Sequence, residues 1–246
     1  MDGMLSQEEI NALLGGMGDS AENTSDVVAN EPTPAAADSN ERLSPEESDA
    51  LGEIANISMG TAATTLSVLV NNRVEITTPK LSYVTLNDLK EQNPAPCVFI
   101  YISYRTGLEG KNILVLKEHD VKVITDLMMG GDGTNTDAEL TDLHLSAISE
   151  AMNQMMGSAA TSMSSMINEK VDISPPSSTR VDLTDTMMED GLHDMVGQTF
   201  VQVSFRMTIG DLVDSEIMQL YPFDFAKLIY TRFRSTMEGG MEETAA

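Results

Sequence analysis

The chain has 246 residues, of which 41% are hydrophobic, and this is enough to bury a core in one sizeable domain or two small ones. Its 39 acidic and 14 basic residues give a formal net charge of -25, which repels a nucleic acid backbone or an anionic lipid surface. One cysteine, Cys97, excludes an internal disulfide framework, and the three histidines are not spaced as zinc ligands. The start of the chain lacks the pattern of a signal peptide, and no apolar run approaches the roughly 18 to 20 residues of a membrane span. We expect a cytoplasmic globular protein with no nucleic acid partner and no membrane insertion.

The first predicted element is a short helix in the segment LSQEEINALL, residues 5–14. Ser6 is a suitable N-cap, and Glu9 completes a capping box with it. The residues expected to contact a partner are Leu5, Ser6, Glu9, Ile10, Leu13 and Leu14. A helix of this length is too short to be stable alone in water. It either folds into the groove of a partner, or it frays or docks on its own domain, and the pattern alone does not decide between these alternatives.

The composition along the chain predicts its domain organisation. Between Gly15 and Glu41 the residues are small, polar or acidic, with no lysine or arginine and almost nothing to bury, which is typical of a flexible tether. We expect a partner-binding peptide over residues 1–15, a flexible acidic linker over 16–42, a folded domain over 43–236 made of two repeats (about 43–136 and 137–236), and a tail over 237–246.

The folded domain is predicted to begin at Ser44, which is an N-cap followed by Pro45 at the first helical position and Glu47 at the third. The long helix runs to about Val70. Strand-like runs follow near VEITTP, CVFIYISY and NILVLK, and then a helix HDVKVITDLMMGG that ends at paired glycines.

The second half repeats this order of elements. It has a helix from about Thr141 to Glu169, strand candidates at VDIS, FVQVSFRMTI and SEIMQLY, and a final helix FDFAKLIYTRF. The pattern predicts an α+β domain with an internal duplication of helix, three strands and helix, its halves packed about a pseudo-twofold axis. Strand pairing between the two halves is a hypothesis at this point.

The segment SDALGEIANISMGTAA, residues 48–63, returns loosely respelled as LSAISEAMNQMMGSAA, residues 145–160. Successive residues of a helix lie about 100° apart around its axis, so residues three or four apart share a face. The apolar residues of each helix fall on one arc, which should face the core. These arcs are Leu51, Ile54, Ala55, Ser58, Ala62, Leu66 and Leu69 in the first helix, and Ile148, Ala151, Met152, Met155, Ala159, Met163 and Met166 in the second. The opposite arcs carry two polar quartets: Asp49, Glu53, Asn56 and Gly60, and Ser146, Glu150, Asn153 and Gly157.

The repeated E-x-x-N pair is a candidate functional site. Many surface helices carry Glu and Asn, so one such pair means little. Here the core arcs differ between the halves while Glu and Asn are identical, which favours a site, although shared ancestry of a recent duplication has the same effect. The helical glycine of each quartet costs about 1 kcal/mol relative to alanine, so either a partner approaches closely there or the protein itself packs tightly there.

The chemistry of the pair points to water positioning. No nucleophilic triad or metal-ligand set is present in the sequence, so the other molecule must supply those parts. A carboxylate can accept hydrogen bonds from a lysine, and a neutral carboxamide can hold one water next to a phosphoryl group without adding charge repulsion. Phosphoryl transfer needs mainly placement of the nucleophile, with a metal and a lysine neutralising charge.

The pattern D/S-x-x-x-E-x-x-N, followed about 22 residues later by proline, resembles the CheC, CheX and FliY phosphatases of bacterial chemotaxis. It occurs twice, as Asp49, Glu53, Asn56 and Pro79, and as Ser146, Glu150, Asn153 and Pro176. The FliY branch is the more similar. LSQEEINALL resembles the N-terminal peptide by which FliM and FliY capture phosphorylated CheY, and EAMNQMMGSAATSMS resembles the second active-site helix of FliY.

This resemblance implies hydrolysis of the aspartyl phosphate of CheY-P. Glu53 and Glu150 would engage the active-site lysine of CheY, Asn56 and Asn153 would orient the attacking water, and Mg²⁺ would be bound by CheY, with no cofactor on this chain. The implied partners are phosphorylated CheY and the switch proteins FliM, FliN and FliG, at the cytoplasmic face of the flagellar basal body. The alternative function is a non-catalytic CheY-P-binding adaptor or structural component of the switch complex.

The sequence departs from the FliY pattern at its end. FliY proteins usually carry a C-terminal switch domain shared with FliN, whereas this chain stops at MEGGMEETAA soon after the phosphatase-like part. A truncated chain and a short form closer in use to CheC are both compatible with the sequence.

Overall fold

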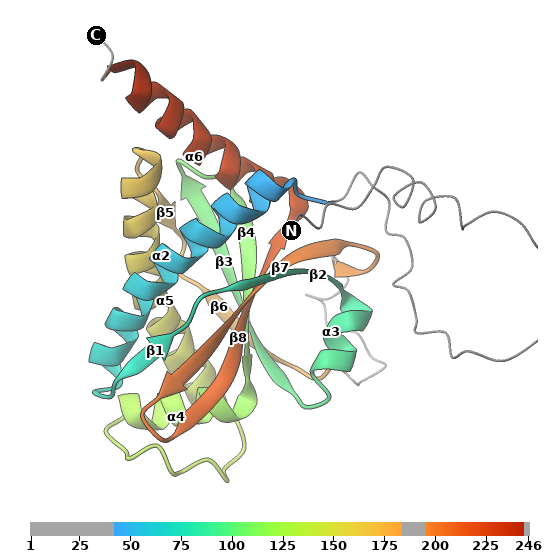
Figure 1. The fold of residues 1–246 in the computed structure, drawn as a ribbon. Helices are drawn as coiled ribbons and strands as arrows, with labels where there is room; N and C mark the ends of the chain where they lie inside the picture. Colours follow the sequence, from blue (N-terminus) through green and yellow to red (C-terminus); the bar gives the residue numbers. More distant parts are fainter. Residues whose placement is uncertain (1–41, 184–194, 244–246) are drawn as a thin grey trace, which may run out of the picture. The chain divides into compact units, whose positions relative to one another are not determined.

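The computed structural model describes residues 42–183 and 195–243 (Figure 1). The predicted N-terminal helix and nearly all of the predicted linker lie outside these residues. The described helices are α2 (Pro45–Leu69), α3 (Leu86–Gln92), α4 (Glu118–Met128), α5 (Asp142–Ile167) and α6 (Phe223–Glu243). The strands are β1 (Val74–Ile76), β2 (Lys80–Thr85), β3 (Cys97–Thr106), β4 (Gly110–Lys117), β5 (Asp172–Ile173), β6 (Ser177–Val181), β7 (Thr199–Ile209) and β8 (Val213–Pro222). None of the described helices is long and apolar enough to cross a membrane.

Capping interactions within the local sequence mark the ends of the two long helices. At the start of α2 the Glu47 backbone N–H donates to Ser44 Oγ at 3.2 Å, and the Ser44 N–H donates to the Glu47 carboxylate at 2.7 Å. The predicted N-cap is therefore confirmed, and with Glu47 it forms a capping box. Both helices are followed by an asparagine with a left-handed backbone, Asn71 with φ 47° after α2 and Asn168 with φ 52° after α5.

The turn after each long helix is held in the same way in both halves. Ser67 Oγ accepts from the Val74 N–H at 2.9 Å, and Ser164 Oγ accepts from the Val171 N–H at 2.8 Å. These serines and valines occupy corresponding positions in the two repeats. The duplication seen in the sequence is therefore also present in the hydrogen bonding.

The eight strands form one antiparallel sheet whose path is β1-β7-β8-β4-β3-β5, with β2 also pairing with β7 and β6 also pairing with β3. The order is symmetric about the central β4/β8 pair, where Leu114 lies opposite Gln219. The strands that follow each long helix pair with the other half: β1 and β2 with β7, and β5 and β6 with β3. The hypothesis of strand pairing across the repeats is confirmed, and the fold class is the predicted duplicated α+β domain.

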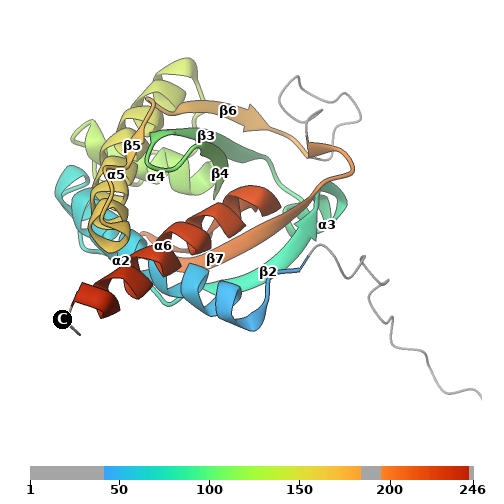
Figure 2. The ribbon, with the colours of Figure 1, turned by 90° about the horizontal axis from the view of Figure 1, so that it is seen from above.

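Helices α2 and α5 lie side by side and antiparallel on one face of the sheet, as Figures 1 and 2 show. Thr65 Oγ1 and Ser158 Oγ meet between them at 2.6 Å. Beneath the pair, Gln219 Nε2 lies 3.4 Å from Met59 Sδ and 4.0 Å from Met156 Sδ, two methionines at corresponding positions of the repeats. The pseudo-twofold axis thus passes between the two helices and the central strands.

The predicted core arcs agree with the structure. All their members are buried except Leu69 and Met166, which are half-buried and pack against the core. A second buried cluster, which includes Phe99, Val115 and Leu220, lies on the opposite face of the sheet.

The structure contains elements that the sequence pattern did not predict. These are β2, α3 and β6, so each half has four strands where three were expected. Strands β2 and β6 begin directly after Pro79 and Pro176, beyond the expected first strand of each half, which the structure shortens to β1 and β5. Helix α6 also continues to Glu243, beyond the predicted end at Phe233. The i, i+4 ion pair of Arg234 with Glu238 at 2.7 Å supports this extension.

Candidate functional site

The first E-x-x-N pair lies on the outward face of α2. Ile54 and Ala55 are buried in the core, and this fixes the rotation of the helix. Glu53 is therefore exposed and Asn56, one turn later, is half-buried on the same face. Within residues 42–183 and 195–243, no group hydrogen bonds to either side chain.

The second pair lies on α5 in the same setting. Glu150 is exposed, Asn153 is half-buried, and the neighbouring Ala151 and Met152 are buried. One contact has no counterpart on α2: Gln154 Nε2 donates a hydrogen bond to Glu150 Oε1 at 2.7 Å. The Asn153 carboxamide makes no hydrogen bond to any other described residue.

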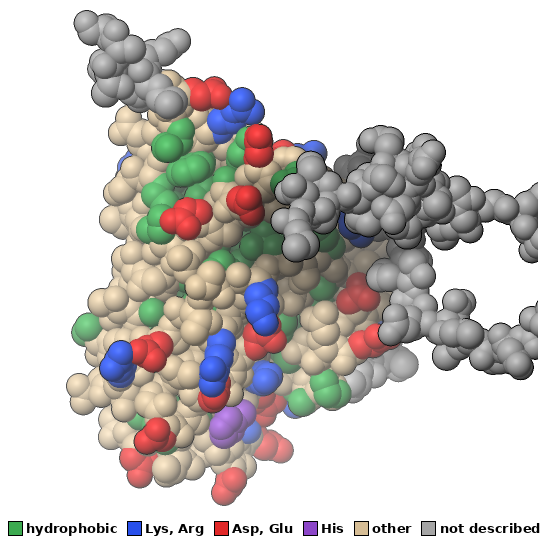
Figure 3. All heavy atoms as spheres, viewed as in Figure 1, with side chains coloured by type: hydrophobic (Ala, Val, Ile, Leu, Met, Phe, Trp, Pro, Cys, Tyr) green, Lys and Arg blue, Asp and Glu red, His purple; other side chains and the backbone are tan. Residues whose placement is uncertain are grey.

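The two pairs form separate sites. Both lie in the N-terminal half of their helix, and the helices run antiparallel, so the sites lie toward opposite ends of the helix pair (Figure 1). Figure 3 shows acidic and hydrophobic side chains over the start of α2, and mostly uncharged polar side chains and backbone over its later turns. Each site is thus an open helical surface that one partner molecule can approach.

The glycines one turn beyond each asparagine border open space. Apart from the adjacent residues and the backbone of its own helix, a Cβ added at Gly60 or Gly157 meets no described atom within 4 Å. Internal packing therefore does not explain these two helical glycines, and the close approach of a partner is the alternative that remains.

The four motif-supporting residues have two different positions. Asp49 and Ser146 are exposed on the outward faces, one turn before the glutamates. Pro79 and Pro176 lie at the strand breaks that follow the long helices, Pro79 half-buried and Pro176 buried. These prolines lie outside the helices and do not belong to the outward faces.

Two connections that hold the site helices were not predicted. On α5, Ser149 Oγ donates to Ser178 Oγ of β6 at 2.9 Å, and Ser178 Oγ donates to the Leu145 carbonyl at 2.8 Å. The corresponding contact on α2 is apolar, because Gly52 lies against Leu81 of β2. No sequence signal identifies the serine contact, since it depends on how β6 is placed.

The described residues contain neither a reactive thiol nor a metal-ligand cluster at the sites. Cys97 is buried in the sheet, and this burial raises the pKa of its thiol to about 11, so it is protonated at neutral pH. No group of three or more potential metal ligands occurs in the part of the chain that the structure describes. His144 acts locally at the start of α5, where Nδ1 accepts from the Thr141 N–H at 3.1 Å.

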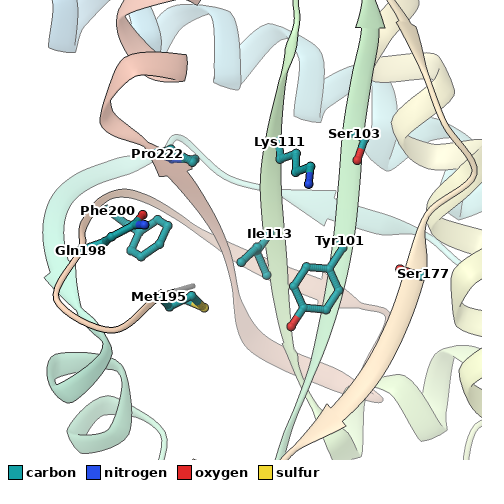
Figure 4. A pocket seen from close by; sticks show the side chains of 9 residues that line it. All are labelled: Tyr101, Ser103, Lys111, Ile113, Ser177, Met195, Gln198, Phe200 and Pro222. Carbon is teal, nitrogen blue, oxygen red and sulfur yellow. The ribbon is translucent and has the colours of Figure 1, made fainter. Parts of the chain in front are cut away.

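A cavity of about 480 Å³ lies on the other face of the sheet (Figure 4). Its lining includes Tyr101, Ile113 and Phe200, and the last two belong to the second buried cluster. None of the E-x-x-N residues lines it. The arrangement of the site therefore favours a macromolecular partner docked on helices α2 and α5 over a small molecule in a pocket.

Comparison with known proteins matches the same two segments. The model of the CheC-like family matches residues 46–83 and 143–180, which are the two long helices with the strands that follow them. The chain is 44% identical over 240 residues to the flagellar motor switch phosphatase FliY of Bacillus subtilis (strain 168), an alignment that covers 98% of this chain and 60% of that protein.

Solved structures share the fold. The crystal structure of Thermotoga maritima FliY superposes with a TM-score of 0.72 at 40% identity, covering 79% of this chain and 98% of that one. The FliM middle domain from H. pylori gives a TM-score of 0.59 at 15% identity, over 77% of this chain and 99% of the other, and shows the fold alone. The chain belongs to the CheC-like family.

Proposed function

We propose that this chain is a phosphatase that hydrolyses the aspartyl phosphate of the response regulator CheY at its two E-x-x-N sites. The observation that carries the proposal is the geometry of α2 and α5: each presents an unobstructed glutamate and asparagine one turn apart, with open space at the following glycine. The relative with 44% identity is named a flagellar motor switch phosphatase, which supports the same activity here.

In the proposed reaction the protein contributes positioning. The Glu53 or Glu150 carboxylate accepts hydrogen bonds from the CheY lysine and so fixes the docked orientation. The Asn56 or Asn153 carboxamide holds a water in line with the phosphorus atom. The water oxygen forms a bond to phosphorus, the bond from phosphorus to the aspartate oxygen breaks, and the products are inorganic phosphate and the free aspartate. The Mg²⁺ that neutralises the phosphoryl charge belongs to CheY.

The partners that the family resemblance implies are part of the same proposal. The residues Leu5, Ser6, Glu9, Ile10, Leu13 and Leu14 would capture CheY-P, and the switch proteins FliM, FliN and FliG would be further partners at the cytoplasmic face of the flagellar motor. The chain spans 60% of the length of the Bacillus subtilis relative, so these whole-protein partners are proposals for this chain.

The decisive experiment is the decay of radiolabelled CheY-P with Mg²⁺ present. We expect the wild-type chain to accelerate the decay, and the Asn56→Ala, Asn153→Ala double variant to lose at least about 10²-fold in kcat/KM, because each asparagine acts in the transition state. The matched control is Asn87→Ala, which removes an exposed asparagine on α3 and should leave the activity unchanged.

Two results would contradict the proposal, and failure of the control would invalidate the comparison. Unchanged hydrolysis by a folded double variant removes the asparagines from the chemistry. Loss of activity in Asn87→Ala shows that the assay reports general damage. Binding of CheY-P by wild type without any acceleration leaves the adaptor function in place of the enzyme.

A further inference from the structure

The two sites differ in the residue that follows each asparagine. In the first site it is Ile57, which is 41% exposed and cannot hydrogen bond through its side chain. In the second it is Gln154, whose amide donates to Glu150 Oε1 at 2.7 Å. Glu53 has no such hydrogen bond among the described residues. One glutamate is thus held and the other is free to change rotamer.

The hydrogen bond from Gln154 leaves the function of Glu150 intact. An ionised carboxylate offers about four lone-pair positions on two oxygens. Gln154 occupies one position on Oε1, so Oε2 is available to a lysine of the partner. Because the glutamate rotamer is already restricted, less conformational entropy is lost when the partner docks.

The charges along the two outward faces also favour the α5 site. The face of α2 carries three carboxylates, Glu46, Asp49 and Glu53, and Glu46 accepts a hydrogen bond from Tyr230 at 3.4 Å. The corresponding positions on α5 are Leu143, Ser146 and Glu150. The oxygens of an acyl phosphate carry negative charge that one Mg²⁺ on CheY compensates only in part, so the repulsion is greater at the first site, which has more carboxylates.

We propose that Gln154 is a positioning residue for Glu150, and that it makes the α5 site the more active of the two toward phosphorylated CheY. This inference rests on the proposed phosphatase function. It goes beyond that function because it distinguishes two sites that share one motif, through the residues Ile57 and Gln154.

The test uses the full chain with one site inactivated at a time. Asn56→Ala leaves only the α5 site, and Asn153→Ala leaves only the α2 site. We expect the α5-only protein to exceed the α2-only protein about three- to tenfold in kcat/KM for CheY-P, with a wider gap at low ionic strength, where repulsion is less screened. Equal values for the two proteins, or a more active α2-only protein, would overturn the inference.

Exchanging the two residues separates positioning from structure. In the α5-only protein, Gln154→Ile should lower kcat/KM about two- to fivefold through KM, with kcat nearly unchanged. In the α2-only protein, Ile57→Gln should raise kcat/KM by a similar factor, and misfolding cannot produce such a gain. When Glu150→Ala is also present, Gln154→Ile should have no further effect, because it acts through that carboxylate.

The outcomes distinguish this inference from the proposed function. If the wild-type chain does not accelerate CheY-P decay, the phosphatase proposal itself fails, and the inference with it. If wild type is active and the double asparagine variant is not, but the Ile57 and Gln154 exchanges leave kcat/KM unchanged, only the positioning inference is overturned.

Discussion

Gly60 and Gly157 are the residues that best distinguish the outward faces of α2 and α5 from an ordinary helix surface. Both lie in the middle of a long helix, where glycine is unfavourable, and neither has a neighbour within 4 Å of the position of a Cβ among the described residues. The structure therefore gives no stability reason for a glycine at either position. A functional reason is that a larger side chain would keep the partner at a distance.

We predict that Gly60→Ala and Gly157→Ala have opposite effects on stability and on activity. Each should stabilise the fold by about 0.5–1 kcal/mol, because alanine is the better helix former and open space is available to it. The combined variant should then melt a few degrees higher, at about 2–4 °C per kcal/mol for a domain of this size. Its KM for CheY-P should rise, as the added methyl groups lie where the partner docks. Thermal unfolding and the decay assay check both parts, and a KM equal to wild type would remove the close-approach explanation.

The sequence predicted the site at the level of residue types and helix faces, and no further. Glu53, Asn56, Glu150 and Asn153 are exposed or half-buried on outward faces as expected, because a fixed angle per residue converts spacing into direction. The hydrogen bond from Gln154 to Glu150 was not predicted, since it depends on two side-chain rotamers. Catalytic roles for these residues stay predictions.

The packing of α6 against the sheet depends on the absence of a side chain at Gly110, the first residue of β4. A Cβ at Gly110 would overlap the Phe225 ring, which is 4% exposed and lies 5.2 Å from the Tyr104 ring, centroid to centroid. The absence of a side chain on β4 is thus what lets the first turn of α6 reach the core.

Gly110→Ala should therefore destabilise the protein by about 1–3 kcal/mol through overpacking. Denaturant unfolding measures the change, and Gly60→Ala is the matched control, because it adds the same methyl group in open space. In a Phe225→Leu background the cost of Gly110→Ala should shrink, since the overlapping ring is gone. An equal cost of Gly110→Ala in both backgrounds would show that overlap with the Phe225 ring is not the cause of the destabilisation.

The elements that the sequence did not predict are those whose conformation depends on a neighbour. Strand β6, Ser177–Val181, has the sequence SSTRV with little apolar alternation, and its extended form comes from pairing with β3. Helix α3 is only seven residues long, although Thr85 and Asp88 form a capping box that the sequence contains. Short elements have weak periodic signals, whereas the long helices and the central strands carry strong ones.

At the scale of the whole molecule, an ion-pair cluster joins the two repeats. Glu118 at the start of α4 pairs with Lys122 at 2.9 Å and with Arg180 of β6 at 2.7 Å. Burial raises the pKa of Glu118, but hydrogen bonds from Lys122 and Arg180 outweigh it and hold that pKa below its ordinary value. The first repeat thus contacts the edge strand of the second through a charged cluster.

The depressed pKa predicts a pH-dependent contribution to stability. The folded state favours the ionised carboxylate, so the stabilisation is fully present above the unfolded pKa of about 4.3 and is lost as the pH falls through the lower folded pKa. Glu118→Gln should cost about 1 kcal/mol at pH 7, a value kept small because the Arg180 side chain is 46% exposed and solvent screens its charge, and the variant should match wild type in acid. Urea unfolding at several pH values tests this. Asp172→Asn, at the solvent-exposed pair with Lys170, is the control. A cost of Glu118→Gln that does not change with pH would contradict the prediction.

The exchange of strands between the repeats has a consequence for the newly made chain. Strands β1 and β2 find their partner only when β7 has been synthesised, more than a hundred residues later on the ribosome. At about 5–20 residues per second this delay is on the order of ten seconds. During that time the first repeat has its two long strands β3 and β4 paired but both sheet edges open, which is a state prone to aggregation. Completion of the fold therefore waits for the second repeat, and neither half of the gene encodes a product that closes its own sheet.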